Sequence, residues 1–283
     1  MTIPTLSYPT KQLLWVSDIH LDQAGDDEKL RFLSKLRGAQ YDALLVTGDI
    51  STATRLVGHL AEISHACGTR PVFFTTGNHD FYGSSFADVD RALADLCNRH
   101  HNLVSLGHGE IVELSPRTAI VGHRGWCDGK AGAGECSKVP SPDRYAIDDF
   151  RNLSRTGYFS KLRSLGEESA TYFRRVLPRA LNRFGTVLIG THFSPFTQAL
   201  KHGGTPCDWD YQPHFSNRSA GNAIVGISRN FPGRKIEVFA GHSHCIAEFS
   251  LSSNLEIRVA GARRGFRLFN RSSPSTDFDS NQL

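Results

Sequence analysis

The sequence lacks the features that mark several classes of protein. None of its apolar runs approaches the roughly 18 residues that a membrane span requires. Residues 1–12 do not show the charged and then apolar pattern of a secretion signal. Six cysteines among 283 residues are few, and none form a Cys-x-x-Cys pair, which argues against a disulfide framework and a zinc ribbon. We therefore expect free thiols in a soluble, cytoplasmic protein without a membrane segment.

The bulk composition is that of a globular protein, with 39% hydrophobic and 21% charged residues. The length suffices for one sizeable core, so we predict a single domain over residues 1–269 and a polar tail over 270–283. The net charge of +4 suits an anionic substrate but does not require nucleic acid. Residues 144–183 hold eight arginines and one lysine against four acids. A solvated helix face and a phosphate-binding surface explain that segment about equally well.

Five short apolar runs have the length of buried strands. Helical patterns separate the first three of them: leucines recur from 30 to 36, and a second stripe from 56 to 63 ends at Gly68. This alternation predicts a βαβαβ arrangement with parallel strands. The five runs are residues 13–16, 43–46, 72–74, 187–189 and 238–240.

The rest of the chain mixes short strands, loops and helices. A third helix is expected over 84–100, and short β-like runs at 111–114 and 118–121 predict a change of strand direction. Residues 122–157 are rich in Gly, Pro and Ser and predict a long loop region of functional or mobile character.

Later elements follow the same kind of pattern. Ser164 and Glu167 form a possible capping box that begins a helix, which Pro178 then disturbs. Another helix is expected over 220–229. The alternating apolar residues between 246 and 269 predict antiparallel strands that close a second sheet.

Each of the five apolar runs is followed at once by residues that bind metal ions. In an open α/β sheet the carboxyl ends of the strands meet at one crevice, so these residues are expected to converge. The set offers carboxylate and amide oxygens and imidazole nitrogens without thiolate, which suits Mn²⁺, Fe²⁺, Fe³⁺, Zn²⁺ or Co²⁺. Seven ligands exceed the needs of one ion but suit two ions about 3.5–4 Å apart that share a carboxylate. The motifs are Asp18-Ile19-His20, Gly48-Asp49, Gly77-Asn78-His79-Asp80, Thr191-His192 and Gly241-His242-Ser243-His244.

In this order, from about residue 13 to 245, the motifs resemble the signature of the calcineurin-like metallophosphoesterase superfamily. That signature reads Asp-x-His, Gly-Asp, Gly-Asn-His-Asp or Glu, a lone His, and Gly-His-x-His. The resemblance implies an α/β fold, a four-layer αββα sandwich of two mixed β-sheets flanked by helices, with a dinuclear metal site at the C-terminal ends of the strands. Carried over by position, it gives Asp18, His20 and His244 to the first metal, Asn78, His192 and His242 to the second, and Asp49 to both.

The chemistry implied is hydrolysis of a phosphomonoester or phosphodiester by a hydroxide held between the two divalent transition metals, which lower the pKa of water from 15.7 toward about 7. His79 follows Asn78 too closely to serve the metals as well, so it is the candidate for protonating or hydrogen-bonding the departing oxygen. Asp80 is expected to fix the tautomer of His79 and to raise its basicity.

Two loops are candidates for substrate contact. Arg124, Trp126 and Asp128 follow a predicted strand in a Gly-Trp loop like one found near the pocket in many bacterial members of the superfamily, with simple loop packing as the alternative. Residues 208–210 and 217–218 lie between two ligand motifs and have the same two interpretations.

The superfamily resemblance leaves the substrate open. Protein phosphatases usually carry Gly-Asn-His-Glu and Gly-Asp-x-x-Asp-Arg-Gly, whereas Asp49 here is followed by Ile-Ser-Thr, so that subclass is disfavoured. The run from His192 to Pro195 looks more like the His-x-x-Pro of phosphodiesterase relatives than the His-Gly-Asp of lipid-A-type pyrophosphatases. We expect a phosphorylated small molecule or nucleotide as substrate. A DNA or RNA nuclease is the alternative enzyme, and a non-catalytic scaffold is the alternative of another class.

Overall fold

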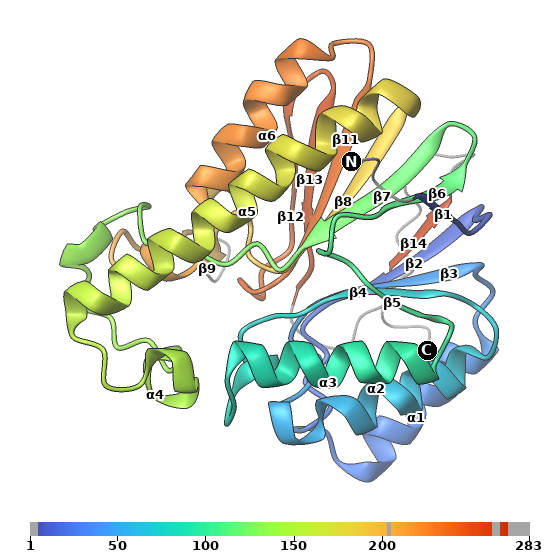
Figure 1. Cartoon of the computed structure of the whole chain (residues 1–283), viewed down its shortest axis with the longest axis horizontal. Helices are drawn as coiled ribbons and strands as arrows, with labels where there is room; N and C mark the ends of the chain where they lie inside the picture. Colours follow the sequence, from blue (N-terminus) through green and yellow to red (C-terminus); the bar gives the residue numbers. More distant parts are fainter. Residues whose placement is uncertain (1–4, 203–204, 262–266, 271–283) are drawn as a thin grey trace.

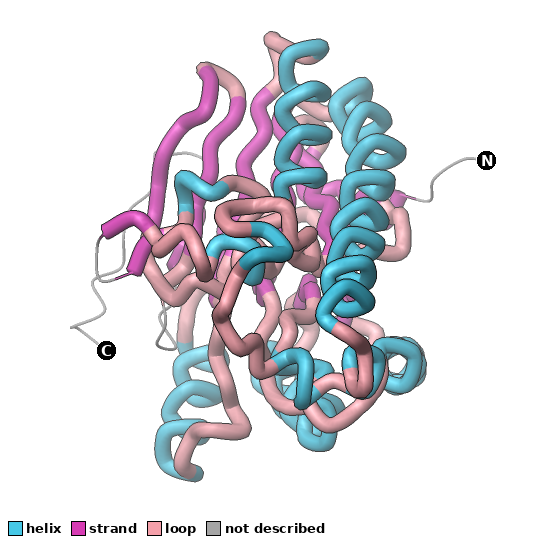
Figure 2. The backbone as a smooth tube through the Cα atoms, turned by 90° about the vertical axis from the view of Figure 1, so that its left-hand side faces the viewer, coloured by secondary structure: helices cyan, strands magenta, loops and turns pink. Residues whose placement is uncertain are grey.

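Two β-sheets packed face to face, with helices on both outer faces, form the computed structural model of the chain (Figures 1 and 2). The structure describes residues 5–202, 205–261 and 267–270. The four layers confirm the αββα sandwich expected from the resemblance. Residues 271–283 of the predicted tail lie outside the described residues, whereas Asn270 is the last residue of a strand.

The five-stranded sheet has the order β14-β2-β3-β4-β5. Its strands β2 to β5 are parallel, because each crossover is a helix that returns the chain to the same edge. Three helices, at the bottom of Figure 1, cover its outer face. The elements are β2 (Gln12–Val16), α1 (Asp26–Gly38), β3 (Ala43–Thr47), α2 (Ala53–Cys67), β4 (Val72–Thr75), α3 (Phe86–Arg99), β5 (Leu103–Ser105) and β14 (Arg267–Asn270).

The seven-stranded sheet has the order β1-β6-β7-β8-β11-β13-β12. β6 and β7 form an antiparallel hairpin, which confirms the predicted change of direction, while β7, β8, β11 and β13 are parallel. Two long helices cover its outer face (Figure 1). The elements are β1 (Thr5–Ser7), β6 (Ile111–Ser115), β7 (Thr118–His123), α5 (Arg155–Arg183), β8 (Thr186–Thr191), α6 (Arg218–Asn230), β11 (Lys235–Ala240), β12 (Ala247–Ser252) and β13 (Leu255–Val259).

The last strand does not lie where the sequence placed it. β12 and β13 pair as expected in the second sheet, but β14 pairs antiparallel with β2 in the first sheet, with Leu268 opposite Leu14. This pairing covers the edge of β2, which would otherwise expose unpaired backbone groups. Phe266, part of the same prediction, lies outside the described residues.

Helix α5 is longer than predicted in both directions. It begins at Arg155, where the Ser154 side chain accepts a hydrogen bond from the Gly157 amide, so the proposed capping box at Ser164 is wrong. It also continues through Pro178 to Arg183. The residues around the proline are fully buried against the second sheet, and this packing offsets the backbone hydrogen bond that proline cannot make.

Side-chain alternation along the strands produces three apolar layers. In β2, Leu14 and Val16 pack toward the helices, whereas Leu13 and Trp15 lie between the two sheets. There the Trp15 ring meets the Phe239 ring of β11 edge-on, with 5.1 Å between centroids. Burying each such side chain contributes about 1.5–3 kcal/mol, so the sheets are joined by an apolar interface that fixes their strand ends together.

The long connection between β7 and α5 is mostly irregular, as predicted. It contains only short helices, at Gly134–Cys136, Asp143–Ala146 (α4) and Asp148–Phe150. A second irregular stretch follows β8 and carries a short helix at Gln212–His214. Among the described residues, no helix is both long and apolar enough to cross a membrane. All six cysteines are free thiols, as expected.

Candidate metal centre

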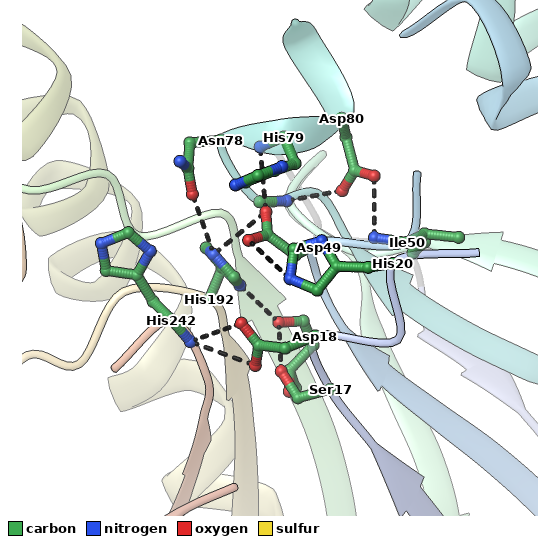
Figure 3. Close-up of polar contacts among 12 residues, drawn as sticks. Ser17, Asp18, His20, Asp49, Ile50, Asn78, His79, Asp80, His192 and His242 are labelled. Atoms are coloured by element: carbon green, nitrogen blue, oxygen red, sulfur yellow. Dashed lines mark hydrogen bonds and ion pairs between the residues drawn. The ribbon is translucent and has the colours of Figure 1, made fainter. Parts of the chain in front are cut away.

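The predicted metal ligands meet where the parallel strands of both sheets end (Figure 3). Asp18, Asp49 and Asn78 follow β2, β3 and β4, while His192 and His242 follow β8 and β11. Their donor atoms form two groups, in each of which all atoms lie within 4.8 Å of one another. One group is Asp18, His20, Asp49 and His244, and the other is Asp49, His192 and His242.

Three short distances define the first group. The Nε2 atom of His20 lies 3.7 Å from Oδ2 of Asp49 and 3.4 Å from Nε2 of His244. Nε2 of His244 lies 3.3 Å from Oδ1 of Asp18. Two imidazole nitrogens and two carboxylate oxygens thus face one small volume, an arrangement that a cation stabilises.

In the second group, backbone carbonyls fix the orientation of the histidine rings. Nδ1 of His192 bonds to the carbonyl oxygen of Thr47 at 2.8 Å, so its Nε2 faces Oδ1 of Asp49 at 3.3 Å and Oδ1 of Asn78 at 3.2 Å. Nε2 of His242 bonds to the carbonyl oxygen of His214 at 3.2 Å, which leaves Nδ1 available to a metal. Asp49 therefore presents Oδ2 to the first group and Oδ1 to the second.

The backbone is strained at most of these residues. Outside glycine, six described residues have positive φ, and five of them are predicted ligands; the sixth is Asn152. Such a conformation is uncommon and costs on the order of 1–3 kcal/mol per residue when the surroundings force it. Its concentration here indicates that the turns are shaped by what the side chains bind. The five are Asp18, His20, Asp49, His242 and His244, with φ values of 53°, 42°, 51°, 67° and 56°.

Glycines in the motifs let the backbone come close to the ligands. A Cβ atom on Gly77 would overlap the carboxylate of Asp49, and one on Gly241 would overlap the side chains of Ser17 and Asp18. Any larger residue at either position would displace a carboxylate, which explains why the motifs contain glycine beside the ligand residues.

The carboxylates and imidazoles share charge strongly. Burial alone would raise the pKa of Asp49, but the neighbouring His192 outweighs it and the pKa is lowered. Burial opposes protonation of His192, yet Asp49 raises its pKa to about 9. In the same way the hydrogen bond from His244 outweighs burial and lowers the pKa of Asp18. The site thus retains buried negative charge that demands a positive partner, and the donor set fits divalent transition metals.

His79 and Asp80 adjoin this cluster in different ways. The backbone amide of His79 donates to Oδ1 of Asp49 at 2.9 Å, and its ring lies beside that of His20, with centroids 4.6 Å apart. The carboxylate of Asp80 accepts instead from the backbone amides of Gly77, Ile50 and Ser51 at 2.7, 2.9 and 2.9 Å.

The structure therefore contradicts the expectation that Asp80 fixes the tautomer of His79. Neighbouring residues of a helical turn point their side chains in different directions, and the carboxylate of Asp80 turns into the core, where it is fully buried. Burial and the charge of Asp49 raise the pKa of Asp80 to about 7. Its bonds connect the turn after β3 with the turn after β4, so Asp80 holds the Asp49 and Asn78 motifs together.

The three candidate substrate contacts in the loop after β7 do not line the cavity above the metal ligands. Arg124 pairs with Asp90 at 2.8 Å, and Trp126 is fully buried among aromatic rings. Asp128, also fully buried, accepts hydrogen bonds from the amides of Lys130 and Ser219. Their contacts correspond to the alternative of simple loop packing.

A cavity of about 630 Å³ lies over the metal ligands. Besides the predicted ligands and His79, loops contribute residues that the sequence did not single out, because no periodic pattern or motif marks them. An adjoining cavity of about 480 Å³ shares Tyr211, Phe215 and Ser243 with it. Of the loop candidates at 208–218, Asn217 is buried and caps α6. The unpredicted lining residues are Tyr82, Val139, Pro140, Ser141, Pro142, Asp143, Tyr211, His214, Phe215, Ser243 and Cys245.

Comparison with known families agrees with this architecture. The family model described as calcineurin-like phosphoesterase matches residues 11–245, and the chain belongs to this family. Membership makes it a metal-dependent hydrolase of phosphoesters in the general sense. No curated protein matches the sequence.

Solved structures show the same fold at low sequence identity. A dimetal phosphatase from Danio rerio is 13% identical, with a TM-score of 0.57, and the match covers 92% of each chain. A protein from Thermus thermophilus has a TM-score of 0.48 at 13% identity over 92% of this chain and 99% of its own. The 5'-nucleotidase from Candida albicans has a TM-score of 0.49 at 11% identity, over 92% of this chain and 48% of its own.

Proposed function

We propose that this protein hydrolyses phosphomonoester or phosphodiester bonds of a phosphorylated small molecule or nucleotide, using two divalent transition-metal ions. One observation carries the proposal: the buried Asp49 presents one carboxylate oxygen to each of the two groups of donor atoms. A carboxylate shared in this way is the arrangement expected of a two-metal site.

In the proposal, Asp18, His20 and His244 hold one metal, and Asn78, His192 and His242 hold the other. Bound metals would supply a nucleophile from water and positive charge for the phosphoryl oxygens. The chain itself orients the ligands through the backbone carbonyls of Thr47 and His214. The cavity above the ligands gives the substrate access to them.

His79 is the proposed donor to the departing oxygen. It lines the cavity, and its backbone amide is anchored on Asp49. Its ring stacks on that of Tyr82, with centroids 4.3 Å apart and an interplanar angle of 27°. This packing holds the imidazole at the edge of the metal ligands, within the space that the leaving group occupies.

The arginine-rich segment gives no particular support to a nuclease. Arg151, Arg163 and Arg174 pair with acids of the same chain, and Arg155 donates to the carbonyl oxygen of Glu135. Cations engaged in this way neutralise neighbouring groups and are less available for a nucleic-acid backbone. The contacts therefore favour a small substrate over DNA or RNA.

A substrate panel tests the function. We expect the Mn²⁺-loaded protein to hydrolyse an aryl phosphomonoester, an aryl phosphodiester or a cyclic nucleotide faster than single-stranded DNA. Absence of hydrolysis of all four with two ions bound would refute an active phosphoesterase. Faster cleavage of DNA, with steeply salt-dependent binding, would establish the nuclease instead.

The role of His79 is tested in the same panel. His79→Ala should slow hydrolysis of esters with poor leaving groups by about 10²–10⁴-fold and should affect good leaving groups much less. His101→Ala, a change at an exposed histidine outside the cavity, serves as the control. Equal losses for good and poor leaving groups would rule out His79 as the acid.

A further inference from the structure

A buried hydrogen-bond network joins the predicted metal ligand Asn78 to a distant loop. Nδ2 of Asn78 donates to Oδ1 of Asp143 at 2.9 Å, across 65 positions of sequence. The Tyr82 hydroxyl donates to the same oxygen at 2.7 Å, and Nδ2 of Asn78 also lies 3.1 Å from that hydroxyl. Asn78 and Asp143 are each only 4% exposed.

The chemistry of an amide gives this network a direction. An asparagine side chain has one end that donates and one that accepts, and either end can face a given neighbour. The carboxylate of Asp143 accepts, so it selects the NH₂ end of Asn78. The oxygen end must then face the opposite way, where it lies 3.2 Å from Nε2 of His192.

The position of Asp143 is itself well determined. It begins the short helix α4, whose Ala146 carbonyl accepts from the Gly83 amide at 2.7 Å. The Asp148 amide donates to the Ser84 carbonyl at 3.0 Å, and the Asp149 carboxylate accepts from the Phe86 amide at 2.8 Å. These bonds dock the loop onto the residues that immediately follow the Asn78 motif.

We infer that Asp143 is a positioning residue of the metal site: with Tyr82, it turns the Asn78 amide so that its oxygen faces the second metal. This inference rests on the proposed function. Because Tyr82 also stacks on His79, the same network connects the second metal, the proposed acid and the loop that covers the cavity.

Asp143→Leu removes the acceptor and leaves the Asn78 amide free to rotate. Orienting partners of metal ligands typically contribute 10–100-fold to metal affinity. We therefore expect one of the two Mn²⁺ ions to bind about 10–100-fold more weakly, while the other keeps its wild-type affinity. Calorimetric titration with Mn²⁺ measures both affinities. Low-temperature electron paramagnetic resonance should show an isolated Mn²⁺ where the wild type shows a coupled pair.

Three further variants separate positioning from a general structural role. Asp143→Asn retains an oxygen that can accept both hydrogen bonds, so it should restore most of the lost affinity. Asp148→Leu, on the same loop but exposed and paired with Arg151, should leave both affinities unchanged. Asp143→Ala adds no volume and provides the same test as the leucine variant if leucine prevents folding.

Wild-type affinity for both ions in Asp143→Leu or Asp143→Ala would overturn the inference, as would equal weakening of both ions. The wild type separates this outcome from failure of the proposed function. A wild-type protein that binds two Mn²⁺ ions but hydrolyses no ester refutes the function, whereas the positioning role is decided by the affinities alone.

Discussion

The two sheets contribute different chemistry to the candidate metal centre. The five-stranded sheet supplies both carboxylates, the amide oxygen of Asn78 and one imidazole, from the turns after β2, β3 and β4. The seven-stranded sheet supplies only imidazoles, His192, His242 and His244, from the turns after β8 and β11. The negative charge thus lies on one sheet and the neutral nitrogen ligands on the other.

This difference teaches that neither sheet alone carries a complete site. The ligand groups form only when the apolar layer between the sheets, with Trp15 against Phe239, brings the two sets of strand ends together. Metal binding is therefore expected to depend on sheet packing, and bound metal is expected to stabilise that packing.

The largest effect should come from the residue that both groups share. Asp49→Asn replaces one carboxylate oxygen by a nitrogen and removes the charge, so we expect Mn²⁺ content to fall from two ions to at most one. Hydrolysis should fall on the order of 10³-fold, the scale of losing one group that stabilises transition-state charge. Metal analysis and steady-state kinetics measure these effects. Asp95→Asn, at an exposed acid, is the control, and unchanged activity in Asp49→Asn would contradict the account.

The interface between the sheets can be weakened without touching a ligand. Phe239→Ala should lower the free energy of unfolding by about 3–5 kcal/mol, because it opens a cavity in a buried layer. Mn²⁺ affinity should fall with it. Phe249→Ala, at a half-buried ring outside the layer between the sheets, should cost less and leave the affinity unchanged. Denaturant titration and calorimetry provide the comparison; equal metal affinity in both variants would separate the site from the interface.

Removal of metal probes the same coupling from the other direction. Ions that bind only the folded chain stabilise it by about 2.7 kcal/mol per site at a free concentration of 100 times Kd. We expect chelation to lower the thermal midpoint, and Mn²⁺ to restore it. An identical midpoint with and without Mn²⁺ would show that the sheets do not depend on the ions.

The smallest effect concerns a histidine at the same edge that is not a predicted ligand. His123 ends β7, packs against Tyr172 and lies 3.6 Å from Glu168; burial is the main reason that its pKa is lowered. Below its unfolded pKa of about 6.5, the unfolded chain binds a proton that the folded chain does not, so this position loses stability as pH falls.

His123→Asn removes this titration while keeping an acceptor for the Gly125 amide, which bonds to Nδ1 of His123. The difference in unfolding free energy between wild type and variant should therefore shift in favour of the variant from pH 7 to pH 5. Urea unfolding across this range measures the difference. A difference that stays constant with pH would mean that His123 takes up its proton equally in both states.

The metal ligands could be predicted from sequence because strand ends dictate where they meet. A short apolar run followed by Asp or His specifies both the strand and the position of the side chain at its carboxyl end, so Asp18, Asp49 and His192 converge in the structure as expected. The same alternation of strands and helices predicted the layers. Such signals are local, and each survives in the fold because packing of the two sheets preserves it.

The residues around the ligands could not be predicted in this way. Asp143, Tyr211 and His214 lie in irregular segments whose path depends on tertiary contacts, so no spacing places them in the cavity. The role expected for Asp80 was wrong because adjacency in sequence does not determine which way a side chain points. The pairing of β14 with β2 likewise depends on an open sheet edge rather than on local pattern.

Anomalous diffraction from crystals loaded with Mn²⁺ tests the central claim most directly. The account predicts two peaks about 3.5–4 Å apart, one on each side of the Asp49 carboxylate. The first should contact Asp18, His20 and His244, and the second Asn78, His192 and His242. A single peak, or two peaks of which neither contacts Asp49, would contradict it.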